Sequence, residues 1–310
     1  RNPEGLEVLM SLVDEADIFL TNFMQPARAK LGIDAKDILA RNPRIIYGRG
    51  TGHGPVGPDA NRPGFDALSY WARSGAAIAG MSNENRYPAL MPGPAFGDIQ
   101  GGMNLAGGIM AGLYQRERTG KGCVVDVSLL SSGMWAMAAS TAGAYSRGTD
   151  NIEQLDRTRA PNPIANIYRS SDDRYFIVGA LEGDRFWPSI CKIVNRPDLI
   201  EDARFATSAD RTTNSEECVA ILESAFETMT LAQIAEALEA AKCPWAAINP
   251  PIHPVEDEQA NANNYIQMVE CGDEGSLPIV SAPIQIDEQA AVLTPAPGHC
   301  EHTDEILMSS

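Results

Sequence analysis

The chain has 310 residues, of which 44% are hydrophobic and 21% are charged, a composition typical of globular proteins. Lys and Arg number 24 against 41 Asp and Glu, so the formal net charge is −17. A protein this acidic repels phosphate backbones, which argues against nucleic acid as a partner and requires a local cationic site for any anionic ligand. No apolar run approaches the ~20 residues that span a bilayer, so we expect no membrane association.

The cysteines and the first residues predict a cytoplasmic protein. Six cysteines are scattered without a C-x-x-C pair, a pattern typical of reduced thiols. The chain starts at Arg1 without a charged segment followed by an apolar one, so we expect no secretion signal. The run His299-Cys300-Glu301-His302 has metal-binding residue types, but four neighbours in one segment cannot all face one ion, and we predict no metal site.

The first 146 residues alternate between helical and extended patterns, which is typical of an α/β layer. Pro3 and Glu4 suit a first helical turn, and Asp34 suits a helix N-cap. In chain order we expect helix 3–15, buried strand 17–22, helix 35–40, strand 44–47, a Gly- and Pro-rich loop over 48–63, helix 65–80, a glycine-rich helix over 98–117, strand 124–129 and a helix that ends near Tyr145.

The second half of the chain predicts a smaller α+β domain. Ser171-Asp172-Asp173 separates two extended segments, 166–169 and 175–180, which predicts a hairpin. Helices are expected over 184–194, 215–229 and 231–241, the last with a capping box of Thr230 and Gln233. The resulting organisation is a large α/β domain over 1–146, a linker over 147–165, a small α+β domain over 166–282, and a segment over 283–310 that ends in a short helix near Thr303 and returns to the first domain.

Gly52-His-Gly54-Pro-Val-Gly57 has the spacing of a dinucleotide-binding loop. Pro55 and Pro58 lack the N–H groups that would hold a pyrophosphate, and the next predicted helix begins too far along the chain. We therefore expect a tight structural loop, which could still lie along a ligand.

Asp98 is the candidate nucleophile. The chain has only four His and no G-x-S-x-G motif, so a carboxylate is the most available reagent. Asp98 lies at the start of the glycine-rich helix, where Asp is a preferred N-cap, and capping alone would explain it. Its flanking glycines leave room for a substrate, and free N–H groups at a helix start could stabilise an oxyanion. The residues alone leave both interpretations open.

The block Pro94-x-x-Gly97-Asp98-x-x-Gly-Gly, with the segment 108–128 that follows it, resembles the signature of the class III CoA-transferases, the carnitine CoA-transferase/formyl-CoA transferase family. Other motifs occur in family order and extend the resemblance over essentially the whole chain: Asn2-Pro-Glu-Gly5, Thr21-Asn-Phe23, Leu31-Gly32, Asn42-Pro-Arg-Ile-Ile-Tyr47, Gly179-Ala-Leu-Glu182, Asp202-Ala-Arg-Phe-Ala-Thr207 and His302-Thr-Asp-Glu-Ile-Leu307.

This resemblance implies a Rossmann-like large domain plus a small α+β domain, in a homodimer whose two chains interlock as rings. The implied reaction moves coenzyme A between an acyl-CoA and a carboxylic acid without a metal. Asp98 attacks the thioester to give an anhydride, and the CoA thiolate then forms an aspartyl-CoA thioester that the acceptor acid takes over. The implied CoA-binding residues are Asn22, Phe23, Lys30, Pro63, Gly64, Phe65 and Asp66. Glu182 is implied as a second catalytic carboxylate near Asp98.

Two alternatives stay open. The α-methylacyl-CoA racemases belong to the same superfamily, but their Gly-His-Asp motif reads Gly64-Phe65-Asp66 here, and Phe cannot move a proton. A non-catalytic CoA-binding protein of the same fold is the second alternative, and the intact Asp98 argues against it.

Departures from the family pattern limit what the resemblance implies. Lys30 stands where the family often has Arg, so it keeps the charge and loses the bidentate fork. The small domain lacks the long glycine loop of formyl-CoA transferases, which argues against formyl-CoA and oxalate. Family members begin with a βαβ segment before Asn-Pro-Glu-Gly, so we expect the chain to be part of a larger protein.

Overall fold

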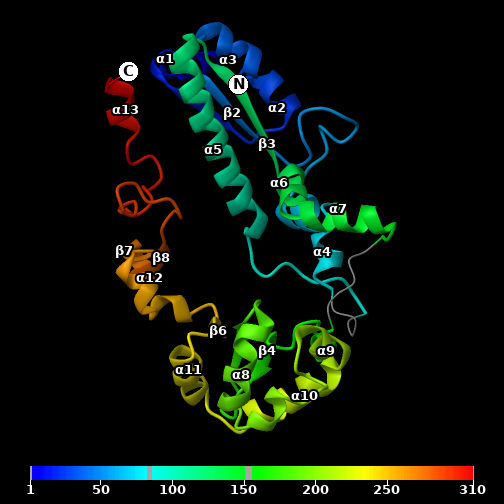
Figure 1. The fold of residues 1–310 in the computed structure, drawn as a ribbon. Helices are drawn as coiled ribbons and strands as arrows, with labels where there is room; N and C mark the ends of the chain where they lie inside the picture. The colour runs from blue at the N-terminus through cyan, green and yellow to red at the C-terminus, as the bar shows by residue number, and fades with distance from the viewer. Residues whose placement is uncertain (1, 82–85, 151–155, 310) are drawn as a thin grey trace. The chain divides into compact units, whose positions relative to one another are not determined.

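The computed structural model describes residues 2–81, 86–150 and 156–309. Contacts divide the chain into two compact units (Figure 1). Unit 1 comprises residues 1–154 with 305–310, and unit 2 comprises residues 155–304. Unit 1 is built around a parallel sheet, and unit 2 combines antiparallel sheets with helices, so the chain is a mixed α/β protein.

The sheet of unit 1 has the strand order β1-β2-β3, with β1 over Ile18–Thr21, β2 over Ile46–Thr51 and β3 over Cys123–Ser128. Both pairings are parallel, and Thr51 lies opposite Ser128 at the end of the second one. Parallel neighbours need crossover connections. Helices α2 (Gln25–Leu31) and α3 (Ala35–Arg41) lie in the first crossover, and α5 (Phe96–Thr119) lies in the second. The three strands therefore end at one edge of the sheet.

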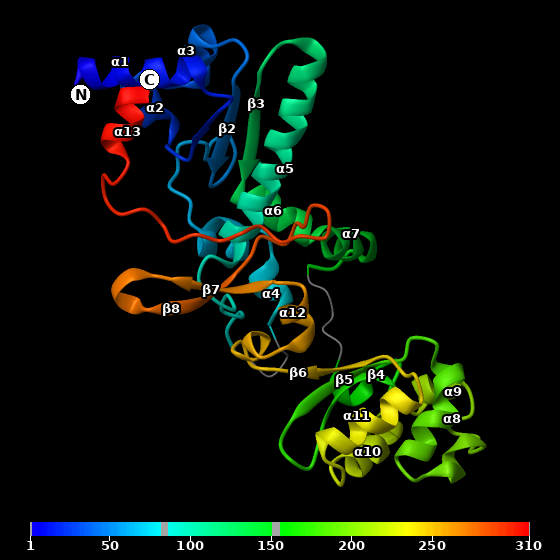
Figure 2. The same cartoon turned by 90° about the vertical axis from the view of Figure 1, so that its left-hand side faces the viewer.

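Helices cover both faces of this sheet (Figure 2). On one face, α1 (Pro3–Glu15) and α3 contribute Val13 and Ile38 to an apolar core with Tyr47 of β2. Asp34 caps α3 in a capping box with Asp37, which confirms its predicted role. These local signals were strong, and the predicted helices 3–15 and 35–40 agree with α1 and α3.

On the other face, glycines let α5 approach the strands closely. A Cβ atom on Gly108 would lie 2.6 Å from Cγ1 of Val125, and one on Gly48 would lie 2.9 Å from Cδ1 of Ile109. Close packing on the protein's own sheet thus explains Gly108 of α5 and Gly48 of β2.

The predictions for β1 and β2 were wrong in detail. β2 continues through Gly48 and Gly50 to Thr51, whereas residues from 48 onward were predicted to be loop. Glycine serves here to admit α5, which composition alone cannot distinguish from a turn. β1 was predicted to be buried, yet Leu20 is 63% exposed.

Two predicted helices are each interrupted. Residues 65–80 form the π-helix η1 (Asp66–Ala72) and the short α4 (Ala76–Ala79), separated by Gly75 with φ +92°. The helix expected to end near Tyr145 is divided at Met137 into α6 (Leu129–Ala136) and α7 (Ala138–Arg147). The apolar composition of both regions correctly predicted helical structure. The positions of the backbone breaks had no distinct signal in the sequence.

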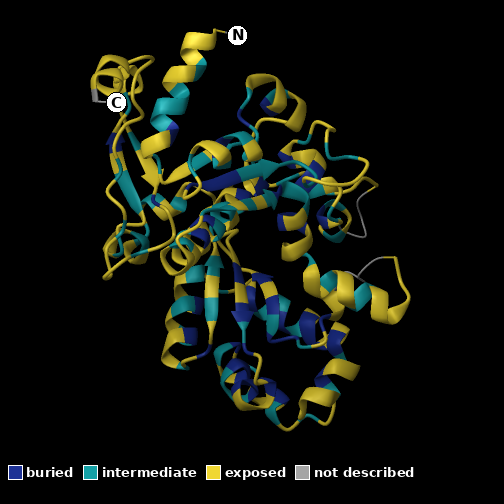
Figure 3. Cartoon of the chain, turned by 90° about the horizontal axis from the view of Figure 1, so that it is seen from above, coloured by how far each residue is buried: buried dark blue, intermediate teal, exposed yellow. Residues whose placement is uncertain are grey.

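Unit 2 contains the predicted hairpin. Strands β4 (Ala165–Arg169) and β5 (Tyr175–Gly179) are antiparallel, and β6 (Trp245–Ile248) extends the sheet in the order β4-β5-β6. Helices α8 (Gly183–Ile193), α10 (Ser215–Phe226) and α11 (Leu231–Ala240) contribute to its apolar core (Figure 3). Thr230 and Gln233 form the predicted capping box of α11.

The sequence predicted no element at several other positions. These elements are α2, β6, η2 (Arg157–Arg159), η3 (Pro197–Ile200), α9 (Ser208–Thr213), η4 (His253–Val255), α12 (Glu258–Ala262), β7 (Ile266–Glu270), η5 (Gly272–Glu274) and β8 (Ser276–Val280). The expected terminal helix is α13 (Thr303–Ser309). Among the described residues, no helix by itself has the length and apolar character to cross a membrane, and α10 with α11 meets both criteria only as a pair bent by 114°.

Candidate active site

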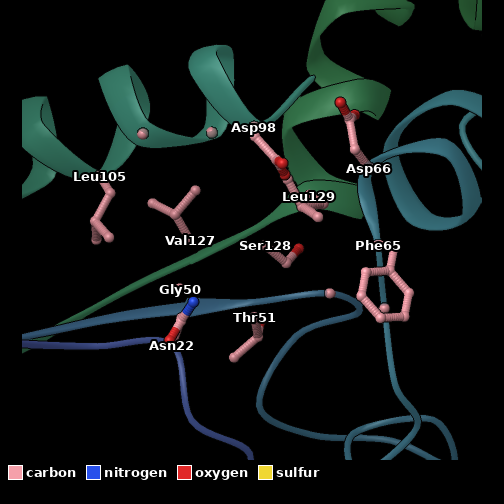
Figure 4. Close-up of a pocket in the computed structure, with 14 residues that line it drawn as sticks. Asn22, Gly50, Thr51, Phe65, Asp66, Asp98, Leu105, Val127, Ser128 and Leu129 are labelled. Atoms are coloured by element: carbon pink, nitrogen blue, oxygen red, sulfur yellow. The ribbon is translucent and has the colours of Figure 1, made fainter. Parts of the chain in front are cut away.

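A cavity of about 530 Å³ lies at the edge of the unit 1 sheet where its three parallel strands end. Asn22 follows β1, Thr51 ends β2 and Ser128 ends β3, and all three line the cavity (Figure 4). The carboxyl ends of parallel strands are the usual ligand-binding edge of open α/β sheets. The cavity is therefore the strongest candidate for an active site in unit 1.

The 14 lining residues come from the strand ends, the start of η1 with the turn before it, the first ten residues of α5 and the start of α6: Asn22, Gly50, Thr51, Gly52, Gly64, Phe65, Asp66, Asp98, Gly101, Gly102, Leu105, Val127, Ser128 and Leu129. In Figure 4, Asp98 extends from the end of α5 into the cavity, with Leu105 and Val127 toward one end and Phe65 toward the other. Within the part of the chain that the structure describes, this lining includes two carboxylates and no Lys, Arg or His.

Asp98 is the third residue of α5, because the helix begins at Phe96 with Ala95 as its N-cap. The interpretation of Asp98 as the N-cap was therefore wrong. A residue distant in sequence binds the first turn instead: the buried carboxylate of Asp66 accepts hydrogen bonds from the N–H of Gly97 at 3.0 and 3.1 Å. This arrangement leaves the side chain of Asp98 free to face the cavity.

The surroundings of Asp98 favour its protonated form. Partial burial, followed by the negative charge of Asp66, raises the pKa of Asp98 above the ordinary aspartate value. Among the described residues, no side-chain hydrogen bond or ion pair holds the Asp98 carboxylate. A carboxylate of raised pKa is more basic than usual once ionised, which suits a nucleophile.

Close backbone approaches hold the site together. A Cβ atom on Gly97 would lie 2.2 Å from Cγ of Tyr70, so η1 and α5 can meet only at glycine. The Tyr70 hydroxyl donates to Oε1 of Gln100 at 2.7 Å and adds a second link between the two helices. A Cβ atom on Gly52 would lie 2.6 Å from Cα of Gly64, which fixes the turn beside the end of β2.

The predicted CoA-binding residues are distributed over two cavities and the surface. Asn22, Gly64, Phe65 and Asp66 line the main cavity. Phe23 lines a smaller adjoining cavity of about 70 Å³, which shares Asn22 and Gly64 with the first. Lys30 on α2 and Pro63 before the turn are exposed, and both lie outside the lining that the described residues give these cavities.

Two arginines that sequence reasoning missed line the smaller cavity. Arg28 is only 2% exposed, and its guanidinium donates to Oδ1 of Asp34 at 2.9 Å and to the carbonyl oxygen of Phe23. Arg28 therefore holds the segment that follows β1. Arg62 is exposed and lies 3.9 Å from Oδ1 of Asp59. The position of Arg62 directly before the turn at Pro63 was the one signal that could have identified it.

Glu182, the second predicted catalytic residue, belongs to unit 2 and directly precedes α8. Its Oε2 atom accepts a hydrogen bond from Nη1 of Arg185 at 2.8 Å, and both side chains are largely exposed. The main cavity is lined by unit 1 residues. Among the described residues, no group of three or more His, Cys, Asp and Glu side chains has an arrangement that could hold a metal ion.

Comparisons with known proteins identify the family of the chain. Residues 1–303 match CoA-transferase family III. The chain is 32% identical over 313 residues to (R)-2-hydroxy-4-methylpentanoate CoA-transferase of Clostridioides difficile, an alignment that covers 100% of this chain and 76% of the relative. It is 29% identical over 309 residues to cinnamoyl-CoA:phenyllactate CoA-transferase of Clostridium sporogenes, covering 99% of this chain and 74% of that protein.

Solved structures show the same fold. The crystal structure of a CaiB/BaiF family protein from Brucella suis superposes with a TM-score of 0.84 and 27% sequence identity, covering 100% of this chain and 79% of that one. The family match extends over nearly the whole chain, and the two relatives at 32% and 29% identity are CoA-transferases. The chain therefore belongs to CoA-transferase family III and is an enzyme that transfers CoA.

Proposed function

We propose that this enzyme transfers CoA from an acyl-CoA to a second carboxylic acid through covalent intermediates on Asp98. One observation carries the proposal: the only lining carboxylate that no described side chain or backbone N–H engages is that of Asp98, at the carboxyl edge of the sheet. Both oxygens of the neighbouring Asp66 already accept from the N–H of Gly97, so Asp66 is the poorer nucleophile.

The proposed reaction balances without water, metal or ATP. A carboxylate oxygen of Asp98 attacks the thioester carbon, the C–S bond breaks, and CoA thiolate leaves behind an acyl-aspartyl anhydride. The thiolate attacks Cγ of Asp98, which releases the donor acid as its carboxylate and forms an aspartyl-CoA thioester. The acceptor carboxylate then attacks Cγ and displaces the thiolate, which attacks the new acyl carbon and restores the Asp98 carboxylate.

The proposed CoA site follows the segment after β1 and the turn before η1. It comprises Asn22, Phe23, Lys30 and the turn over Pro63–Phe65. Asn22, Phe23 and Phe65 line the two cavities, which share lining residues, and this supports the assignment. We add Arg62 as a cation for the CoA phosphates, because the acidic chain needs a local positive charge and Arg62 lines the smaller cavity.

The proposed substrates are acids with an apolar side chain. Leu105, Val127 and Leu129 supply apolar lining. The two relatives are named for a branched hydroxy acid and for aromatic acids, which also have apolar side chains. A cavity lined by carboxylates would repel the second charge of a dicarboxylic acid.

The finer architecture is part of the proposal. We infer a Rossmann-like large domain over 1–146, a linker over 147–165, a small domain over 166–282 and a returning segment over 283–310. The active form is an interlocked homodimer in the cytoplasm, in which Glu182 of one of the two chains approaches Asp98. The family membership of the chain supports these inferences.

Trapping tests the covalent role of Asp98. The wild-type enzyme, incubated with acyl-CoA and then hydroxylamine, should carry a hydroxamate on Asp98 that peptide mass spectrometry locates. Asp98→Ala and Asp98→Asn should lack the adduct and lose transfer by at least about 10³-fold. Both variants should stay folded, because the raised pKa means that burying the ionised carboxylate costs stability at neutral pH. Substantial transfer by Asp98→Ala would disprove the assignment.

The two alternative functions, racemase and non-catalytic CoA binding, predict different results when the same enzyme is incubated with acyl-CoA. A racemase-like enzyme would exchange the α-hydrogen of the acyl group with deuterium from the solvent without needing an acceptor acid. Phe65 in place of a titratable residue argues against this activity. A non-catalytic CoA-binding protein would bind acyl-CoA and give no hydroxylamine adduct.

A further inference from the structure

We propose that Asp66 is a positioning residue that fixes the first turn of α5 and so aims the nucleophilic carboxylate of Asp98 into the cavity. This role replaces the CoA contact that the resemblance implied for Asp66. The inference rests on the proposed function of Asp98, and its experiment separates a failure of one from a failure of the other.

The hydrogen bonds of Asp66 carry the inference. Its two carboxylate oxygens lie 3.0 and 3.1 Å from the N atom of Gly97, the residue directly before Asp98. The side chain of Asp66 is nearly buried, whereas the adjacent Phe65 is 68% exposed. A buried acceptor with two short contacts to one N–H has little freedom to turn toward a ligand. The backbone that enters Asp98 is therefore held from the side of η1.

Packing around Gly97 makes this support rigid. A Cβ atom on Gly97 would lie 2.4 Å from Oδ1 of Asp66, as well as 2.2 Å from Cγ of Tyr70. The backbone of α5 thus rests directly on the carboxylate and the ring. Loss of the Asp66 carboxylate would open a space beneath the N–H of Gly97 and leave that buried donor unpaired. A small rotation of this first turn would move the Asp98 carboxylate away from the thioester carbon.

Asp66 also brings a negative charge close to Asp98. Other titratable groups on the elements that pack against α5 are engaged elsewhere. Tyr70 of η1 donates to Gln100. Arg49 of β2 and Asp126 of β3 bond to each other, with Nη2 and Oδ2 2.9 Å apart. Gly48 and Gly50 of β2 face α5. Because side chains alternate along a strand, Tyr47 and Arg49 point to the opposite face of the sheet.

Strand β3 carries one further ionisable group, Cys123, at the end away from the cavity. Cys123 lies at the start of β3, beside Gly112 near the far end of α5. Among the described residues, Asp66 is thus the charged group that shares the cavity lining with Asp98. Repulsion between the two carboxylates contributes to the raised pKa of Asp98, after partial burial.

Two substitutions separate the charge of Asp66 from its hydrogen bond. Asp66→Asn keeps one acceptor oxygen for Gly97 and removes the charge, so the acid limb of the kcat/KM profile should move to lower pH. Asp66→Ala removes charge and acceptor, so kcat should fall by on the order of tenfold or more while the Kd of free CoA changes little. If Asp66→Ala does not fold, Asp66→Glu decides the question, because it keeps the charge but displaces the acceptor from the N–H of Gly97 and should lower kcat.

Asp126→Asn is the matched control, because Asp126 lies on the opposite face of the sheet and Arg49 retains Asp34 at 4.0 Å. Its pH profile should match that of the wild type. The proposal is overturned if both Asp66 variants keep wild-type kcat and the wild-type acid limb, or if they change only the Kd of CoA. Absence of a hydroxylamine adduct on wild-type Asp98 would instead refute the proposed function itself.

Discussion

Asp66 and Asp98 line the same cavity, but their immediate surroundings differ. Both carboxylate oxygens of Asp66 accept from the backbone N–H of Gly97, and Asp98 accepts no hydrogen bond from the described side chains. Partial burial and the charge of Asp66 raise the pKa of Asp98, so its ionised, nucleophilic fraction falls as the pH drops through that raised value. Two carboxylates in different environments can thus serve different purposes, one in support and one in chemistry.

The cations at the site make a testable contrast. Arg62 lines the smaller cavity, whereas Lys30 is exposed on α2 outside it. We expect Arg62→Glu to raise the Kd of CoA by on the order of tenfold, because a charge-assisted hydrogen bond to phosphate is lost, and Lys30→Glu to raise it less. Isothermal titration calorimetry at low and high salt should show both effects shrinking as salt screens the phosphates.

Arg44→Glu is the control for this comparison, since Arg44 precedes β2 at the edge opposite the cavity. Equal changes in Kd for Arg62→Glu and Arg44→Glu would mean that only net charge matters. A larger effect for Lys30→Glu than for Arg62→Glu would favour the family position over the cavity position.

At the scale of elements, several glycines of α5 allow close contact with the sheet and η1. Gly97 and Gly108 leave too little space for a Cβ atom, with neighbours at 2.2 and 2.6 Å, and a Cβ atom on Gly112 would be tight at 3.1 Å from Sγ of Cys123. Gly102 and Gly107 have no such neighbour within 4 Å. Of the helix glycines, Gly101 and Gly102 line the cavity. The glycines of this helix therefore have different roles. Some allow close packing and some line the cavity, whereas Gly107 meets no steric requirement.

Paired substitutions in α5 test this explanation. Gly107→Ala should stabilise the protein by about 0.5–1 kcal/mol, because Ala is the better helix former and no atom opposes its Cβ. Gly108→Ala should destabilise it by about 1–3 kcal/mol, because the stiff Val125 side chain must shift. Urea unfolding of the two variants measures both changes, and equal stabilisation by both would contradict the packing argument.

At the scale of the whole molecule, unit 1 supplies the cavity and the proposed nucleophile, and unit 2 carries Glu182. The ion pair of Glu182 with Arg185 is exposed, and such pairs contribute little to stability. If Glu182 takes part in catalysis, it must act with Asp98, which belongs to unit 1. The proposed interlocked dimer offers such an arrangement.

Glu182→Gln tests that arrangement. We expect it to lower kcat without a change in thermal stability and to shift the acid limb of the pH–rate profile, because a charge near Asp98 is removed. Asp184→Asn offers a contrast in the same segment, since Asp184 accepts hydrogen bonds from Ser208 and Arg211 and its loss should lower stability. Wild-type kinetics for Glu182→Gln would remove Glu182 from the mechanism.

The sequence by itself determined what depends on near neighbours along the chain. The helix at 3–15, the capping boxes at Asp34 and Thr230, and the hairpin around 171–173 follow from contacts within a few residues. The motif around Asp98 predicted the family, which the family match confirmed. These features carry their own signal because each depends on local hydrogen bonds and side-chain periodicity.

Only the tertiary structure decided which residues meet across the chain. Asp66 and Gly97 are separated by 31 positions, so no local pattern could show that one binds the other or that Asp98 is not the N-cap. The glycines at 48 and 50 predicted a loop, and the strand forms there because α5 packs above them. A glycine needed for a turn and a glycine needed for close packing have the same side chain. The neighbours that distinguish them are brought together by folding alone.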